Sequence, residues 1–318
     1  MTKDIKEIEI FILVTIIYFL GFFILYLSNI NLQTIVLLQS KLIEFFVLGT
    51  QVMSKSELIV NIFSPIIYSI ISFLIFSAGL TLLSVRKIGN IKYLLAIPIF
   101  SSGVLFNFSI PFIFFAIGLY IANLYAIPLG ETYFLELKKW KKYRVGSNTI
   151  GRVFFIIFLI TSIGCFISFS INDSYQNLFM NSTIDGIKKV TKAELTNIQM
   201  NSDTDMLIDE YMENFRNEYP DLTEEQYAQV KEQIRKNIKN QNSNINITQS
   251  IDKIIKNSIM LSSFLSWFPV IMAIVIWLFL EFIRTVIIIP LSGIFSYLWF
   301  YGFKNEENKE NTDSRNRE

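Results

Sequence analysis

The sequence predicts an all-α fold, a polytopic transmembrane helical bundle of about six spans with an extracytoplasmic helical stalk domain. Hydrophobic residues make up 52% of the chain. They are gathered into uncharged runs, and a helix needs about 20 such residues to cross a hydrocarbon core about 30 Å thick. The runs are Ile10–Ser40, Leu58–Val85, Tyr93–Gly130, Val153–Asn172, Asn257–Leu280 and Thr285–Phe303.

The charges and reactive residues of the chain exclude several classes of function. The net charge is +1 and the charged residues lie between the apolar runs, so no concentrated basic face for nucleic acid is expected. The chain has no histidine and one cysteine, Cys165, which excludes an intrachain disulfide and a histidine general base. We find no catalytic motif or cofactor fingerprint. The sequence therefore predicts a non-enzymatic protein with no cofactor and no metal site.

The first predicted crossing covers residues 8–27. Its amino-terminal flank, Lys3–Glu9, is mixed in charge and no clear small-x-small cleavage site follows, so we interpret it as a retained anchor rather than a cleaved signal. Residues 29–56 are apolar on one helix face only, which favours an interfacial helix. The second predicted crossing covers residues 60–83.

The uncharged run 93–130 is too long for one crossing, and the Asn107–Pro111 stretch offers a turn. We therefore expect two crossings, 91–107 and 110–129, followed by a fifth at 152–171 that completes a membrane region over residues 1–171.

A carboxyl-terminal membrane region is predicted over residues 259–303, with a sixth crossing at about 259–280. Pro290–Gly293 interrupts the apolar run after it, which indicates either a seventh crossing or a broken re-entrant or interfacial segment. We favour the second alternative, because it keeps the tail 304–318, expected to be disordered and charged, on the inner side.

Lysine and arginine in short loops predict the orientation, because such loops stay cytoplasmic. The loop after the second crossing is purely basic, and the loop from Glu131 to Arg152 is rich in lysine. Residues 172–258 are net acidic. We expect a multi-pass protein of the plasma membrane with a cytoplasmic amino terminus and with residues 172–258 outside.

Residues 172–258 form the one sizeable polar region, and their apolar residues recur at helical spacing. We expect Tyr211, Phe215 and Tyr227 to contact an extracytoplasmic protein partner. An acidic patch in the same region could attract calcium, but its spacing does not fit an EF-hand, and we favour a solvated helix face. The patch consists of Asp203, Asp205, Asp209, Glu210 and Glu213.

Two groups of charged residues are candidate sites in the membrane region. Glu281 and Arg284 lie between two apolar runs, three residues apart, and are either a functional polar pair or a marker of the inner interface. The second group is a basic run with an aromatic residue, expected at the inner lipid surface or acting only as a topology signal. It comprises Lys138, Lys139, Trp140, Lys141, Lys142 and Arg144.

Three functional hypotheses from different classes follow. We favour a scaffold or assembly factor whose external helices bind a protein partner. The alternative is a channel or facilitator that uses proline-broken helices, with Asn61, Asn107, Asn123 and Glu281 as lining candidates. An intramembrane enzyme is the weakest hypothesis, because a nucleophile would lack a base. The lipid bilayer is an expected partner, and the sequence leaves the oligomeric state undefined.

Overall fold

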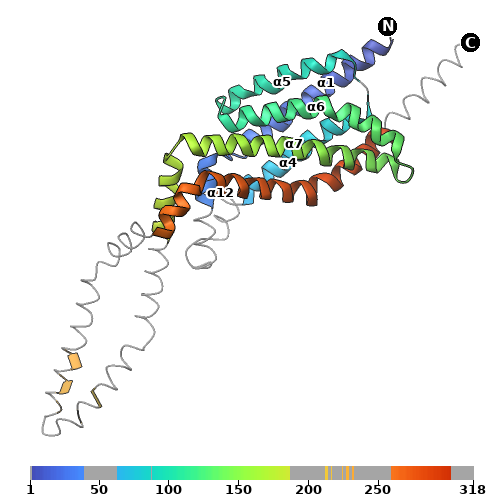
Figure 1. Ribbon diagram of the computed structural model, residues 1–318. Coiled ribbons are helices and arrows are strands. Elements are labelled where there is room, and N and C mark those ends of the chain that lie inside the picture. The colour runs from blue at the N-terminus through green and yellow to red at the C-terminus, as the bar shows by residue number, and fades with distance from the viewer. Residues whose placement is uncertain are drawn as a thin grey trace, which may run out of the picture. The chain divides into compact units, whose positions relative to one another are not determined.

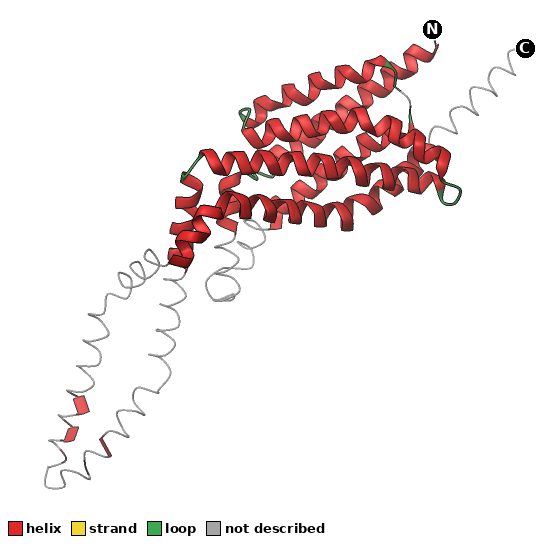
Figure 2. Cartoon of the chain, in the orientation of Figure 1, coloured by secondary structure: helices red, strands yellow, loops and turns green. Residues whose placement is uncertain are grey.

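The computed structural model describes residues 2–38, 63–86, 88–186 and 259–301, together with residues 212–213, 216, 224, 227–228 and 231–232. These residues form helices joined by short turns, and no strand occurs among them (Figures 1 and 2). The predicted all-α fold is confirmed for this part of the chain.

The chain divides into two compact units. The first unit contains the apolar helices and comprises Met1–Ile35, Lys55–Tyr175 and Trp267–Glu318. The second unit comprises Val36–Ser54 and Gln176–Ser266 and includes most of the predicted stalk. The division therefore falls close to the composition change at residue 172 that the sequence shows.

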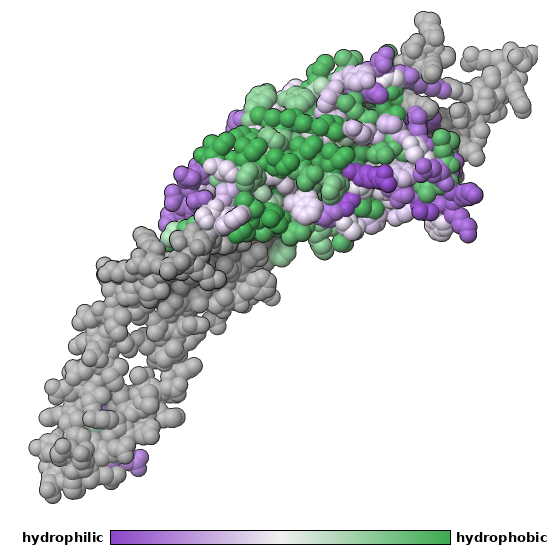
Figure 3. Space-filling view, in the orientation of Figure 1, coloured by the Kyte–Doolittle hydropathy of each residue, from purple (hydrophilic) through white to green (hydrophobic). Residues whose placement is uncertain are grey.

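Within the described residues, five helices are long and apolar enough to cross a membrane by length and composition. They are built from α1 (Thr2–Leu27), α4 (Ser64–Val85), α6 (Ile110–Glu136), α7 (Lys141–Ile171) and α12 (Ile259–Ile283) with its continuation. Their apolar segments run over Lys6–Leu27, Ser64–Val85, Ile110–Glu136, Lys141–Ile171 and Leu265–Tyr301. Hydrophobic residues cover the middle of the bundle face in Figure 3, and hydrophilic residues gather toward the end that carries the α6–α7 turn. This pattern is typical of a membrane protein.

The predicted crossing at 91–107 corresponds to three short helical pieces rather than one α-helix. These are η3 (Asn90–Leu95), α5 (Ala96–Ser101) and η4 (Ser102–Phe106). The expected turn follows them, with Asn107 and Phe108 in the left-handed region at φ values of 49° and 46°. Because 3₁₀ turns rise about 2.0 Å per residue and α turns about 1.5 Å, the three pieces together extend about 31 Å.

These three pieces run alongside α1 over most of its length. At one end the Gly89 amide donates a hydrogen bond to Glu7 Oε2 at 3.0 Å. At the other end the Phe106 ring meets the ring of Phe22 and that of Tyr26, each with centroids 6.3 Å apart. The segment thus covers the same height in the bundle as the membrane-length helix α1.

The last apolar helix does not break where the sequence suggested. α12 continues through a π-helical turn, η5 (Arg284–Ile288), and then as a helix over residues 289–301. In the π-turn the Ile289 amide bonds the Arg284 carbonyl, one residue farther back than in an α-helix. The wider turn comes directly before Pro290 and relieves the clash that a proline ring makes with the preceding turn. The chain neither turns back at Pro290 nor reverses into a seventh crossing.

The helices of the first unit pack closely through glycines. A Cβ at Gly118 of α6 would lie 3.0 Å from Ile157 Cα of α7, and a Cβ at Gly130 would lie 2.1 Å from the Ser84 carbonyl oxygen of α4. Aromatic rings fill the space between α1, α4 and α6, with Phe76 4.8 Å from Phe22 and 5.5 Å from Phe115 between centroids. The Phe22–Phe76 pair is edge to face and the Phe76–Phe115 pair is tilted, and both pairs help to hold the three helices in one arrangement.

Candidate functional site

Glu281 and Arg284 form an ion pair at the point where α12 passes into the π-turn. Arg284 Nε donates a hydrogen bond to Glu281 Oε2 at 2.8 Å, and Arg284 Nη2 donates to Glu281 Oε1. The Arg284 side chain is 16% exposed and the Glu281 side chain is 24% exposed. A bidentate pair of this kind is geometrically specific as well as neutral overall. A π-turn is a frequent feature of functional positions in helices.

Arg284 also connects α12 to α7. Its Nη1 donates a hydrogen bond to the Gly151 carbonyl oxygen, and its guanidinium carbon lies 5.7 Å from the centre of the Phe155 ring. A Cβ at Gly151 would lie 3.7 Å from Arg284 Nη1 and 3.2 Å from Ile289 Cδ1, so a larger side chain would crowd this contact. Nε, Nη1 and Nη2 of the arginine are all engaged. The geometry favours a clamp between two helices over a site that awaits a ligand.

The level of this clamp in the bundle follows from neighbouring charges. The α6 run Ile110–Gly130 is uncharged and extends about 31 Å, and Glu131 follows it. Ser84, close to the end of α4, lies beside Gly130 of α6. The first charged residue that follows each of them along the chain therefore lies at a similar height in the bundle. Arg152 reaches back toward this level, 5.3 Å from the Tyr133 ring centre. Arg284 instead points toward Gly151, away from the lipid headgroups. Glu281 therefore compensates its charge, and the headgroups do not.

A second buried polar contact, between α1 and α6, was not foreseen as a pair. The Tyr18 hydroxyl donates a hydrogen bond to Asn123 Oδ1, and Asn123 Nδ2 donates to the Leu119 carbonyl oxygen at 2.9 Å. Both side chains are 0% exposed. Asn123 was predicted as a channel-lining residue, but its polar atoms are occupied within the packed interior. Asn123, a polar residue within an apolar run, could be recognised in the sequence as a candidate for a buried contact. Its partner Tyr18, 105 positions away, could not.

The other described lining candidates are separated from Asn123. Asn107 lies in the turn between η4 and α6, and Glu281 pairs with Arg284. Asn61 lies outside the described residues. The structure therefore does not bring the described candidates together along one path.

The predicted basic run forms the turn between α6 and α7 and the first turn of α7. Trp140 is in the left-handed region at φ 54° and is 80% exposed, and Leu135 on the other side of the turn is 82% exposed. Phe134 stacks on Phe300 with centroids 5.7 Å apart, and Lys141 Nζ lies 3.7 Å from the Phe134 ring centre. Exposed basic side chains surround this turn, namely Lys138, Lys139, Lys142 and Arg144.

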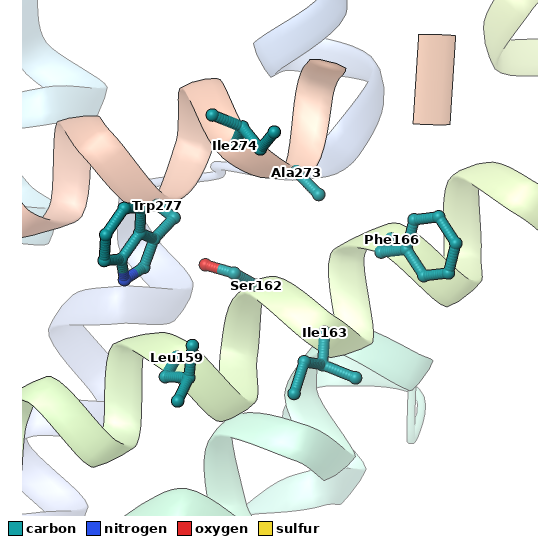
Figure 4. Close-up of a pocket in the computed structure, with 7 residues that line it drawn as sticks. All are labelled: Leu159, Ser162, Ile163, Phe166, Ala273, Ile274 and Trp277. Atoms are coloured by element: carbon teal, nitrogen blue, oxygen red, sulfur yellow. The ribbon is translucent and has the colours of Figure 1, made fainter. Parts of the chain in front are cut away.

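A shallow apolar groove of about 260 Å³ lies between α7 and α12 (Figure 4). Ser162 lies at its base, where its hydroxyl donates to the Phe158 carbonyl oxygen at 2.8 Å, and Trp277 closes one side. The groove is also lined by Leu159, Ile163, Phe166, Ala273 and Ile274. Its walls are exposed aliphatic and aromatic side chains of membrane-length helices, so surrounding lipid chains can fill it.

The predicted partner-contact and acidic residues lie mostly outside the described part of the chain. Tyr211, Phe215 and the acidic patch from Asp203 to Glu210 are not described. Tyr227 is 8% exposed, and the guanidinium carbon of Arg216 lies 5.1 Å from its ring centre. Arg216 also pairs with Glu224. The contact of Tyr227 with a protein partner stays a prediction. Among the described residues, no group of carboxylates and cysteine is arranged to hold a metal ion.

Comparison of the chain with protein-family models, with curated proteins and with solved structures gives no match.

Proposed function

We propose that this protein is a non-enzymatic membrane scaffold whose bundle holds residues 172–258 on the extracytoplasmic side, where they bind a protein partner. The observation that carries the proposal is that polar groups in the apolar helices are used to tie helices together. Arg284 ties α12 to α7, Tyr18 ties α1 to α6, and the Ser72 hydroxyl donates to the Gly21 carbonyl oxygen at 2.8 Å between α4 and α1.

A bundle tied in this way is suited to hold an attached segment in place. In the sequence, residues 172–258 connect the end of α7 to the start of α12. Among the described helices, α6 and α7 pack most extensively on each other, and α7 is the helix to which this segment is attached. Anchoring both ends also lowers the entropy cost of closing the segment, which favours helices that would be marginal alone.

The side on which the segment lies is argued from charge. The α6–α7 turn and the first turn of α7 carry four lysines, and the opposite end of α7 leads into the acidic segment. Short lysine-rich loops remain in the cytoplasm, so the segment belongs outside. The proposed location is the plasma membrane, with six crossings that include Asn90–Phe106, because this segment extends as far along the bundle as α1 does.

Site-specific photo-cross-linking tests the partner proposal. A photoreactive amino acid is placed at Tyr211 or Phe215 in the full-length protein in its native cells. We expect one defined protein adduct from each position, with the same partner identified by mass spectrometry. The matched control is Asn107, which lies in a turn at the extracytoplasmic end of the bundle under the proposed orientation. Adducts with lipid alone, or a random set of proteins equal to that from Asn107, would refute the scaffold proposal.

A further inference from the structure

The α6–α7 turn exposes the two large hydrophobic side chains that are most accessible in the described part of the chain, Leu135 and Trp140. Backbone hydrogen bonds fix the conformation of the chain at Trp140. Trp140 adopts the left-handed conformation directly before α7, and its carbonyl accepts hydrogen bonds from the amides of Tyr143 at 3.1 Å and Arg144 at 2.9 Å. This turn therefore presents Trp140 on the surface in a defined position.

The base of the turn is fixed to the carboxyl-terminal helix. Phe134 stacks on Phe300 at an interplanar angle of 22°, with Lys141 Nζ on its ring. On the same helix the Ser296 hydroxyl donates a hydrogen bond to the Lys142 carbonyl oxygen at 2.6 Å. The backbone that carries the exposed residues Leu135 and Trp140 is thus fixed to the carboxyl-terminal helix.

With Gly130, the last residue of the uncharged α6 run, at the edge of the hydrocarbon core, the turn lies at the outer edge of the headgroup layer. Glu136, the last residue of α6, lies about 9 Å beyond Gly130 along the helix axis. The headgroup layer on each side of the hydrocarbon core is about 5–8 Å thick. Tryptophan is favoured at this depth, where its ring is half in contact with apolar chains and its N–H remains near water.

We infer that the α6–α7 turn binds anionic phospholipid headgroups, with Trp140 and Leu135 inserted between lipids and Lys138, Lys139, Lys142 and Arg144 on the phosphates. The charge complementarity supports this occupant, because four exposed cations surround two apolar side chains on one turn. Lys141 lies on the Phe134 ring, so it supports the base of the turn and is not counted among the phosphate-binding residues. This inference goes beyond the scaffold proposal and does not depend on a protein partner.

The test labels an introduced cysteine, because the single native cysteine of the chain is buried. Cys165 is 4% exposed, so a fluorescent label can be attached selectively at Leu135→Cys in the full-length protein. The labelled protein is placed in nanodiscs of phosphatidylcholine alone or mixed with phosphatidylglycerol. Accessibility is measured with acrylamide, a neutral aqueous quencher. The matched control carries the label at Ile171→Cys, which is 70% exposed at the other end of α7.

We expect phosphatidylglycerol to shield the label at position 135 in a saturable manner and to leave the label at position 171 unchanged. Each lysine near an anionic surface contributes about a fivefold preference, so Lys139→Gln should raise the phosphatidylglycerol fraction for half-shielding about fivefold. The triple variant K138Q/K139Q/K142Q should show no saturable shielding. The variant K138R/K139R/K142R keeps the charge and should behave as the original, which separates loss of charge from loss of folding.

Equal shielding in both lipids, or an unchanged response of the triple glutamine variant, would overturn the inference. Shielding at position 135 by soluble polyglutamate, without any effect of phosphatidylglycerol, would assign the turn to an acidic protein and would also overturn it.

Discussion

At the scale of single residues, the main finding is that the charges of Glu281 and Arg284 in the last apolar helix neutralise each other by direct pairing. Arg284 has three of its nitrogen atoms engaged, with Glu281 and with the Gly151 carbonyl oxygen. An unpaired charge among apolar helices is costly, whereas a pair with satisfied hydrogen bonds is tolerated. The same logic applies to Asn123, whose amide would otherwise be buried without partners.

We predict that Glu281 and Arg284 are energetically coupled. Either Arg284→Gln or Glu281→Gln alone should lower the free energy of unfolding by about 1–3 kcal/mol, because it leaves the other charge partly buried without its partner. The double variant should lose clearly less than the sum. Unfolding of the purified protein in mixed micelles, followed by circular dichroism, measures these differences.

The control for the Arg284 variants is Arg152→Gln, because Arg152 is an exposed arginine one residue from Gly151. It should change stability little, as is usual for surface charges. Additive losses from Glu281→Gln and Arg284→Gln would contradict the clamp.

At the scale of elements, the close approach of two helices depends on glycines at their contact points. Gly130 places α6 against the Ser84 carbonyl of α4, and backbone atoms cannot move aside as the end of a flexible side chain can. Small residues serve this purpose widely between membrane helices, because they allow the backbones to pack. The π-turn at Arg284–Ile288 is the other local device, since it carries one helix past Pro290.

We predict that Gly130→Ala destabilises the bundle by about 1–3 kcal/mol, because the new methyl group has no room beside Ser84. The measurement is the midpoint of thermal unfolding of the purified protein in detergent. Gly186→Ala is the matched control: no atom of the described residues lies within 4 Å of its Cβ position, so it should be neutral or slightly stabilising. Equal behaviour of the two variants would show that the α4–α6 contact is looser than described.

At the scale of the whole molecule, the number and direction of the crossings decide which surfaces meet which compartment. The described helices alternate in direction along the chain, with turns at Asn107–Ser109 and at residues 137–140. The α6–α7 turn and the end of the last helix lie together through the Phe134–Phe300 stack. The tail that follows Tyr301 therefore starts from the same end of the bundle as this turn.

We predict that single cysteines at Asn107 and Asn181 react with a membrane-impermeant maleimide in intact cells, and that a cysteine at Lys139 reacts only after permeabilisation. Cys165, which is buried, provides a low background. This pattern follows from Asn90–Phe106 crossing the membrane and from the charge of the α6–α7 turn. A reactive Lys139→Cys in intact cells would reverse the proposed orientation, and an unreactive Asn107→Cys would remove the crossing at Asn90–Phe106.

Much of the architecture could be predicted from local features of the sequence. The uncharged runs predicted α1, α4, α6 and α7, and the Asn107–Pro111 stretch predicted the turn before α6. The predicted crossing at 152–171 lies within α7, which begins earlier, at Lys141, because polar residues also continue a helix once it packs on a neighbour. The spacing of Glu281 and Arg284 was enough to foresee their pairing, but not the bond to Gly151.

The sequence by itself determined that the chain forms several long apolar helices of membrane-spanning length, because the length of apolar runs and the position of charges act locally along the chain. The tertiary structure decided which polar groups meet, namely Tyr18 with Asn123 and Arg284 with Gly151. It also decided that Leu135 and Trp140 project together from one turn. These contacts join residues far apart in sequence, and they depend on the crossing and rotation of packed helices, which no local pattern encodes.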